Sequence, residues 1–164
     1  MTDLDGLDGS PEAEEWFFYL LFQAVRRRDA AFAKALAQFG LDLGKWRTLS
    51  VVRRLAGCTM NELAEFTTID RTTLTRTADQ LAAAGFVERQ GSAADRRLVC
   101  LVITEAGHAV FGQALDAMRG FNAVALQGVE DDELAVLKTA LGKILLNITG
   151  SESRTRAILD FSRP

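Results

Sequence analysis

The sequence predicts a mainly α-helical chain that carries one small β-hairpin. Its only prolines, Pro11 and Pro164, lie near the two ends, so no proline between them breaks a helix. After Gly85 the pattern changes to extended segments rich in β-branched residues. The 164 residues, 48% hydrophobic and 25% charged, are enough for one sizeable core and too few for two independent ones. We therefore expect one mostly helical domain.

The first predicted helix, residues 12–39, is apolar on more than one face. Its large apolar side chains are Trp16, Phe17, Phe18, Leu20, Leu21, Phe22, Phe32, Leu36 and Phe39. A surface helix of a small monomer needs only one apolar face, and large exposed apolar patches are typical of interfaces. The pattern predicts a second burial partner for this helix.

The segment "KWRTLSVVRRL", residues 45–55, predicts a second helix. Its apolar residues Trp46, Leu49 and Val52 are expected to face the core, whereas its arginines, Arg47, Arg53 and Arg54, are expected to be solvated.

A third, short helix should begin at Thr59, because Thr59 followed by Glu62 forms a capping box. After a turn, Asp70 is a good N-cap for a fourth helix, which Gly85 should terminate. A short helix, a tight turn and a second helix have the form of a helix-turn-helix.

The fourth helix has two different faces. Leu74, Ala78 and Leu81 gather on one side with Thr77 at its edge, and the opposite side is rich in threonine and arginine. Threonine is a mediocre helix former. Short hydroxyl side chains, however, allow close approach to DNA, and arginine can reach guanine with two hydrogen bonds. The residues predicted to contact DNA from this helix are Arg71, Thr72, Thr73, Thr75 and Arg76.

The segments "FVERQ" and "LVCLVIT" predict the two strands of the hairpin, joined by a turn-like stretch that ends in "DRR". Its tip carries Asp95, Arg96 and Arg97. Two cations on a β-wing that directly follows the fourth helix are placed to contact a flanking minor groove or the DNA backbone. Residues 44–103 are therefore predicted to form a winged helix-turn-helix that binds double-stranded DNA.

Two further helices follow. Thr104 should cap a fifth helix with apolar residues at steps of three and four, and "EDDE" should open a sixth, leucine-rich helix. Residues 12–43 and 104–149 together are predicted to form a dimerisation region. Residues 1–11 are expected to be a flexible acidic tail, and residues 150–164 show no clear pattern and are expected to be a C-terminal tail.

Charge is distributed unevenly along the chain. The net charge is −3 and the isoelectric point is near 5.2, which argues against binding of nucleic acid by bulk charge, although a net charge can hide a local patch. Residues 44–105 nevertheless hold nine basic and seven acidic side chains, whereas residues 1–43 hold four and eight. An anionic partner is therefore expected to dock on the middle third.

These segments also carry a family resemblance. "IDRTTLTRTADQLAAAGFVER", the following "DRR" and "ITEAG" resemble the recognition helix and wing of the MarR family of bacterial winged helix-turn-helix regulators, and "GLDLGKWRTLSVVRRL" is similar to its second helix. The resemblance covers roughly residues 12–149. It implies an intertwined homodimer and a repressor whose DNA affinity a small molecule lowers. By motif, Asp95 would orient Arg97 toward the minor groove, and Thr72, Thr73 and Arg76 would face the major groove.

The resemblance further implies an effector pocket where the dimer helices meet the winged domain. Its candidate residues are Phe22 and Trp46 for ring stacking, Arg27 or Arg28 for a carboxylate, and His108. A small aromatic acid or a related acyl thioester is the expected effector.

Other classes of function leave weaker signals. No Gly-rich phosphate loop or nucleophile motif is present, and His108 is the only histidine, so neither an enzyme, a cofactor nor a metal site is expected. A thiol-based redox regulator using Cys58 and Cys100 stays open, as does a helical interaction protein that binds no DNA, although the first helix lacks the cysteine of the family's peroxide sensors.

The cellular location is expected to be the cytoplasm. The acidic N-terminus is unlike a secretory peptide, and the apolar run "WFFYLLF" is far too short to span a membrane. Two cysteines in a chain of this size fit a reducing compartment.

Overall fold

The computed structural model describes residues 11–67, 69–91 and 99–161, and of these the side chains of residues 16–160. The helices are α1 (Pro11–Ala37), α2 (Leu43–Arg54), α3 (Met60–Thr67), α4 (Arg71–Ala83), α5 (Glu105–Ala125), α6 (Asp131–Thr149) and α7 (Glu152–Phe161). The strands are β1 (Cys58–Thr59), β2 (Val87–Gly91) and β3 (Val99–Ile103). The predicted fold class, mainly α with a small β-wing, is confirmed.

The helix starts follow from local capping chemistry, as the sequence predicts. At α3 the backbone N–H of Thr59 donates to Glu62 Oε2 at 2.8 Å, and the N–H of Glu62 donates to Thr59 Oγ1 at 3.3 Å. At α5 the side chain of Thr104 accepts from the N–H of Gly107 at 3.0 Å. Gly85, with φ +74°, ends α4 in the left-handed conformation that favours glycine.

The hairpin belongs to a three-stranded antiparallel sheet with the order β1-β3-β2. Val87 pairs with Ile103 and Gly91 with Val99, as expected for the two long strands. The sheet also contains a strand that the sequence did not predict, β1, where Cys58 pairs with Leu101 and Thr59 with Cys100. Strand β1 connects the segment before α3 to the base of the wing.

The core lies where α1, α2, α4, α5 and the sheet meet. The stacked rings of Trp46 on α2 and Phe111 on α5 lie 4.7 Å apart, and Phe32 of α1 meets Trp46 edge-on at 5.5 Å. These three rings therefore join α1, α2 and α5. The other fully buried large side chains include Leu36, Leu49, Leu63, Leu74, Leu81 and Leu101.

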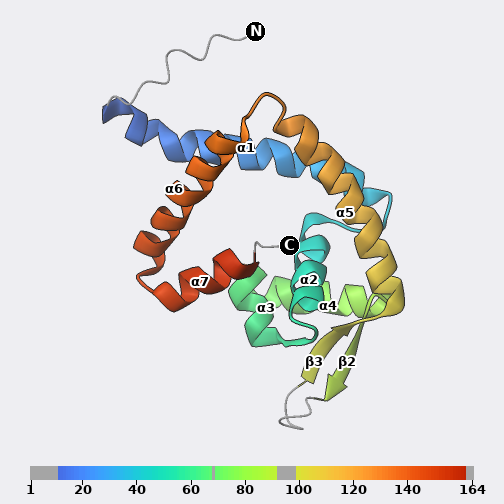
Figure 1. The fold of residues 1–164 in the computed structure, drawn as a ribbon. Helices are drawn as coiled ribbons and strands as arrows, with labels where there is room; N and C mark the ends of the chain where they lie inside the picture. Colours follow the sequence, from blue (N-terminus) through green and yellow to red (C-terminus); the bar gives the residue numbers. More distant parts are fainter. Residues whose placement is uncertain (1–10, 68, 92–98, 162–164) are drawn as a thin grey trace.

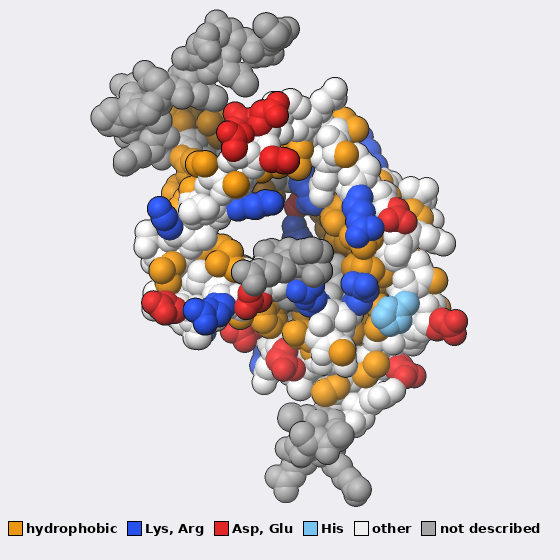
Figure 2. Space-filling model, in the orientation of Figure 1, with side chains coloured by type: hydrophobic (Ala, Val, Ile, Leu, Met, Phe, Trp, Pro, Cys, Tyr) orange, Lys and Arg blue, Asp and Glu red, His pale blue; other side chains and the backbone are white. Residues whose placement is uncertain are grey.

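The long helices surround an open space instead of packing into one bundle. In Figure 1, α5 rises from the wing to α1, α6 descends on the far side, and α7 returns toward α3. Figure 2 shows an opening through the molecule between these elements. No residue of α6 is buried, and Leu137 and Ile148 are 44% and 70% exposed.

Residues 150–164 are not the patternless tail that the sequence indicates, because α7 occupies most of them. Among the α7 side chains that the structure describes, residues 152–160, only Thr155 is buried, and the Thr149 and Thr155 hydroxyls lie 2.8 Å apart at the junction with α6. None of the helices in the described part of the chain is long and apolar enough to cross a membrane.

Candidate nucleic-acid interface

Helix α4 is fixed to the protein by one face only. Leu74, Ala78 and Leu81 are fully buried, and Thr77 is 7% exposed at the edge of this row. Asp70 caps the helix by accepting a hydrogen bond from the backbone N–H of Thr73 at 2.9 Å, and this bond lowers the pKa of the Asp70 carboxyl. The predicted orientation of α4 is confirmed.

The opposite face of α4 is open to solvent. Arg71, Thr72, Thr73, Thr75 and Arg76 are all exposed, as their predicted role requires. The Thr75 hydroxyl donates to the carbonyl of Arg71 at 2.9 Å and keeps both oxygen lone pairs for another donor. Among the described residues, Arg76 has no ion-pair partner. Its guanidinium N–H donors are thus available to a ligand.

Two side-chain pairs fix the surroundings of this face. Arg71 donates to the side-chain amide oxygen of Asn61, which joins the start of α4 to α3. Arg89 of β2 forms an ion pair with Asp79 of α4. The Asp79 and Arg89 side chains are 54% and 48% exposed, so the pair stabilises the fold only modestly. Its geometric effect is to set the base of the wing relative to α4.

The tip of the wing carries three residues that the sequence predicts to contact DNA. Asp95, Arg96 and Arg97 lie outside the described residues. Both strands that lead to them are described, and they run antiparallel to Gly91 and Val99.

The wing joins α5 through a close backbone contact. The N–H of Thr104 donates to the carbonyl of Phe86 at 3.1 Å, and the Thr104 hydroxyl donates to the carbonyl of Gly85 at 2.6 Å. Gly107 lies directly against Phe86, and a Cβ at Gly107 would overlap the Phe86 carbonyl oxygen. These contacts therefore fix the end of α4, the start of β2 and the start of α5 relative to one another.

The three arginines of α2 are exposed, as expected, but they are not merely solvated. Arg47 forms an ion pair of 2.6 Å with Asp29 of α1. The guanidinium of Arg53 lies 4.7 Å from the ring centre of Phe111 on α5, and Arg54 donates to the backbone carbonyl of Asp160 on α7 at 2.7 Å. Sequence reasoning missed these contacts, which connect α2 to α1, α5 and α7.

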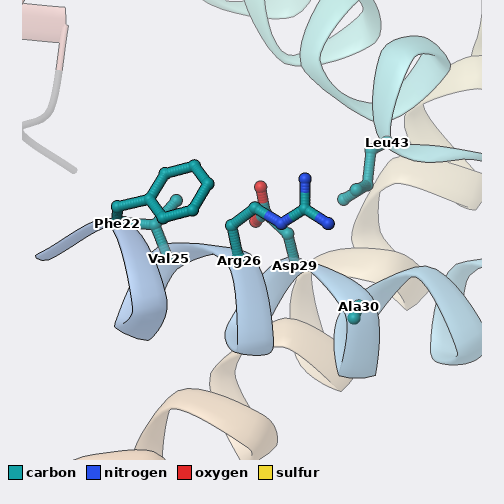
Figure 3. A pocket seen from close by; sticks show the side chains of 6 residues that line it. All are labelled: Phe22, Val25, Arg26, Asp29, Ala30 and Leu43. Carbon is teal, nitrogen blue, oxygen red and sulfur yellow. The ribbon is translucent and has the colours of Figure 1, made fainter. Parts of the chain in front are cut away.

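A cavity of about 410 Å³ lies between α1 and the start of α2. It is lined by Phe22, Val25, Arg26, Asp29, Ala30 and Leu43, and its surface is mainly apolar. Figure 3 shows the Arg26 side chain extending from α1 across this space, beside the Phe22 ring. The Arg26 guanidinium lies 5.6 Å from the centre of that ring.

The structure does not bring the five predicted effector residues together. Phe22 lines the cavity, whereas Trp46 is 8% exposed and packed in the core. Arg28 donates to Asn122 of α5 and to Asp29, at 3.2 Å each. Arg27 is exposed on α1, and His108 is exposed in the first turn of α5. Arg26 and Asp29, which sequence reasoning did not select, are the charged residues of this cavity.

The two cysteines lie on neighbouring strands but on opposite faces of the sheet. Cys58 pairs with Leu101 and is buried, whereas Cys100 pairs with Thr59 and is partly exposed. Burial, with smaller effects from Glu62 and Cys100, raises the pKa of the Cys58 thiol to about 12. A thiol with this pKa is protonated at neutral pH.

The fold is that of a winged helix-turn-helix DNA-binding protein. It has a short capped helix, a turn, a second helix with an open polar face and an antiparallel hairpin. A family model described as "MarR family" matches residues 39–98. The chain is similar to the MarR family of transcriptional regulators, which are not enzymes, both in the sequence of this segment and in its fold.

The matches to individual relatives extend over most of this chain and most of each relative. HTH-type transcriptional regulator BilQ of Clostridium symbiosum is 27% identical over 133 residues, which cover 80% of this chain and 91% of BilQ. The structure of a MarR-family regulator from Silicibacter pomeroyi matches with a TM-score of 0.75 and 27% identity, over 92% of this chain and 99% of that one. A mutant form of MarR from E. coli, solved in complex with operator DNA, matches with a TM-score of 0.72 and 25% identity, over 84% and 99%.

Proposed function

We infer that this regulator reads its DNA site through the N-terminal half of α4 and the tip of the wing. The observation that carries this proposal is the open face of α4, where Arg71, Thr72, Thr73, Thr75 and Arg76 are exposed while the other side is packed. Arg76 is the residue that reads a base, since its guanidinium has no ion-pair partner among the described residues. Asp95, Arg96 and Arg97 supply the flanking contacts.

The working form is a homodimer built from residues 12–43 and 104–149. Two surfaces support this proposal. On α1, Trp16, Phe18, Tyr19 and Phe22 are each at least half exposed. On α6 no residue is buried. A second copy that covers both surfaces places two recognition helices about 34–36 Å apart, so the operator is a pseudo-palindrome.

The effector of this regulator is a small aromatic acid or a related acyl thioester, and its binding releases a repressor from the operator. The cavity between α1 and α2 offers a suitable site, since Phe22 supplies a ring for stacking and Arg26 a cation for a carboxylate. This assignment replaces Arg27 and Arg28 by their neighbour Arg26. Asp29 joins the cavity to α2, because the same carboxylate accepts from Arg47.

A thiol switch is the alternative to a ligand switch, and the geometry disfavours it. Cys58 is fully buried with a pKa of about 12, whereas a redox-sensing cysteine needs a thiolate and solvent access. Cys58 and Cys100 also point to opposite faces of the sheet, which does not suit a disulfide between them.

Selection of bound genomic fragments, followed by binding measurements on the selected site and on random DNA, tests the proposal. Arg76→Ala should cost about 1–3 kcal/mol on the selected site and much less on random DNA. Arg119→Ala, a charge-matched control on α5, should leave the preference intact, since Arg119 is 67% exposed and pairs only locally with Asp116. Equal losses on both DNAs in Arg76→Ala would remove Arg76 from base reading.

A further inference from the structure

The C-terminal helix α7 lies beside the helix-turn-helix unit of its own chain. In Figure 1, α6 descends from the region of α1, and α7 then turns back toward α2 and α3. Gly150, with φ +61°, makes this reversal possible. Helix α2 is thus approached by α7 and is also connected to α1, through the ion pair between Arg47 and Asp29.

Two polar contacts join α7 to the helix-turn-helix unit. Arg54, the last residue of α2, donates from Nη2 to the backbone carbonyl of Asp160 at 2.7 Å. Arg154 Nε lies 3.7 Å from Oε1 of Glu65 on α3. The contacts involve both ends of α7 and both helices that precede the recognition helix, so they restrain position and direction together.

The other side of α7 is held on α6. The Thr149 and Thr155 hydroxyls lie 2.8 Å apart across the bend, and Thr155 is 6% exposed. Leu159 lies against Gly142, where an added Cβ would meet its two methyl carbons at 3.8 and 3.9 Å. Helix α7 therefore contacts α6 on one side and α2 and α3 on the other.

We propose that α7 is a strut that sets the orientation of the helix-turn-helix unit relative to the dimerisation helices, and through it the spacing of the two recognition helices. This inference rests on the proposed homodimer. Without α7, each unit is oriented by its connections to α1 and α5 alone. With α7 docked, α6 provides a further attachment, and rotation of α4 about the end of α5 is restricted.

The test uses the double variant Arg54→Gln, Arg154→Glu, which shortens one donor and places a carboxylate opposite Glu65. A spin label on Ala83→Cys, in a Cys100→Ser background that keeps the buried Cys58, reports the distance between the two copies of α4. Hydrogen exchange of the α7 amides reports its docking. We expect faster exchange in α7, a broader distance distribution, and a loss of affinity for the selected DNA site of about fivefold or more.

Three matched variants distinguish the effect of losing the strut contacts from the effect of a general change in charge. Arg156→Glu reverses a charge on the same helix at a residue without an ion pair in the described part of the chain, and should change nothing. Arg54→Lys keeps a donor, and Glu65→Arg with Arg154→Glu restores an opposite-charge pair, so both should keep the narrow distribution.

The possible failures of the two proposals are distinguishable. A wild-type protein that is monomeric by sedimentation, or that selects no DNA site, contradicts the proposed function itself. A different result overturns the strut and leaves the proposed function in place. In that case the wild-type protein is a dimer that binds its site, but the α7 exchange or the distance distribution of the double variant matches that of wild type.

Discussion

Gly107 lies in the first turn of α5, where glycine is normally a poor choice for helix stability. Replacing an interior helical glycine with alanine ordinarily stabilises a protein by up to about 1 kcal/mol. At Gly107 we predict the opposite sign. A Cβ there would overlap the carbonyl oxygen of Phe86, lie 2.7 Å from Cγ1 of Ile103 and lie 3.0 Å from the carbonyl carbon of Phe86.

The size of the effect follows from what has to move. Two of the three close atoms belong to the backbone of Phe86, which cannot turn aside like the end of a side chain. Overpacking of this kind costs about 1–3 kcal/mol. The Phe86 carbonyl also accepts from Thr104 at 3.1 Å, and weakening that bond costs about 1 kcal/mol more. After the gain in helix propensity, Gly107→Ala should lose about 1–3 kcal/mol.

Gly112, five residues further along α5, is the matched control. An added Cβ at Gly112 meets nothing within 4 Å, so Gly112→Ala should gain about 0.5–1 kcal/mol. Urea unfolding followed by circular dichroism gives both free energies. Because Phe86 begins the segment that leads into the wing, Gly107→Ala should also weaken DNA binding. Equal stability of the two alanine variants would refute the close approach between α5 and Phe86.

Three other predictions address the wing, the thiols and the core. Arg97→Ala should reduce the salt dependence of DNA binding by about one unit of slope for each lost phosphate contact, and an unchanged slope would give the wing a structural role only. The double variant Cys58→Ser, Cys100→Ser should still release DNA with the cognate small molecule, whereas peroxide-triggered release that disappears in this variant would establish a redox sensor. Thr48→Val should stabilise the protein by about 1 kcal/mol in urea unfolding, because the fully buried Thr48 hydroxyl has no hydrogen-bond partner among the described residues, and a loss of stability would indicate a hidden partner.

The parts of the fold that could be predicted from sequence are those determined by residues close together in the chain. Thr59 with Glu62, Asp70 with Thr73, and Thr104 with Gly107 are each three residues apart, and all three caps form. The faces of α4 follow from helical periodicity in the same way. Capping and periodicity act within one or two turns, so the sequence alone contains the required information.

Strand β1 and helix α7 are different, because both depend on distant residues. Cys58 and Thr59 are too few to form an alternating pattern, and they pair with residues about forty positions later. Of residues 152–160 of helix α7, only Thr155 is buried, and the docking partners of the helix lie on α2, α3 and α6. Tertiary contacts, which leave little periodicity in the sequence, hold these elements in place.

The effector residues show why the type of a residue does not determine its role. The ring of Trp46 suggests stacking on a ligand, but the structure stacks it on Phe111. Arg26 and Arg28 are equivalent by type, yet they differ in direction. Arg26 extends into the cavity, whereas Arg28 donates to Asn122. Only the direction of each side chain around α1 separates a residue that lines the cavity from one that joins two helices.

The contacts of the helix-turn-helix unit provide a route by which the proposed effector at α1 can act on α4. Asp29 lines the cavity and accepts from Arg47 at 2.6 Å, and Trp46, the neighbour of Arg47, packs on the core rings of α1 and α5. In the proposed switch, an anionic effector beside Arg26 would bring a second negative charge close to Asp29 and change the electrostatic balance of the Asp29–Arg47 pair. The helix-turn-helix unit is connected to α1, α5 and α7 at separate points, so we expect a change at one connection to rotate the unit about the other two. Rotation of this kind needs only a difference of about 1–3 kcal/mol in effector affinity between two arrangements to alter DNA binding by about 5–150-fold.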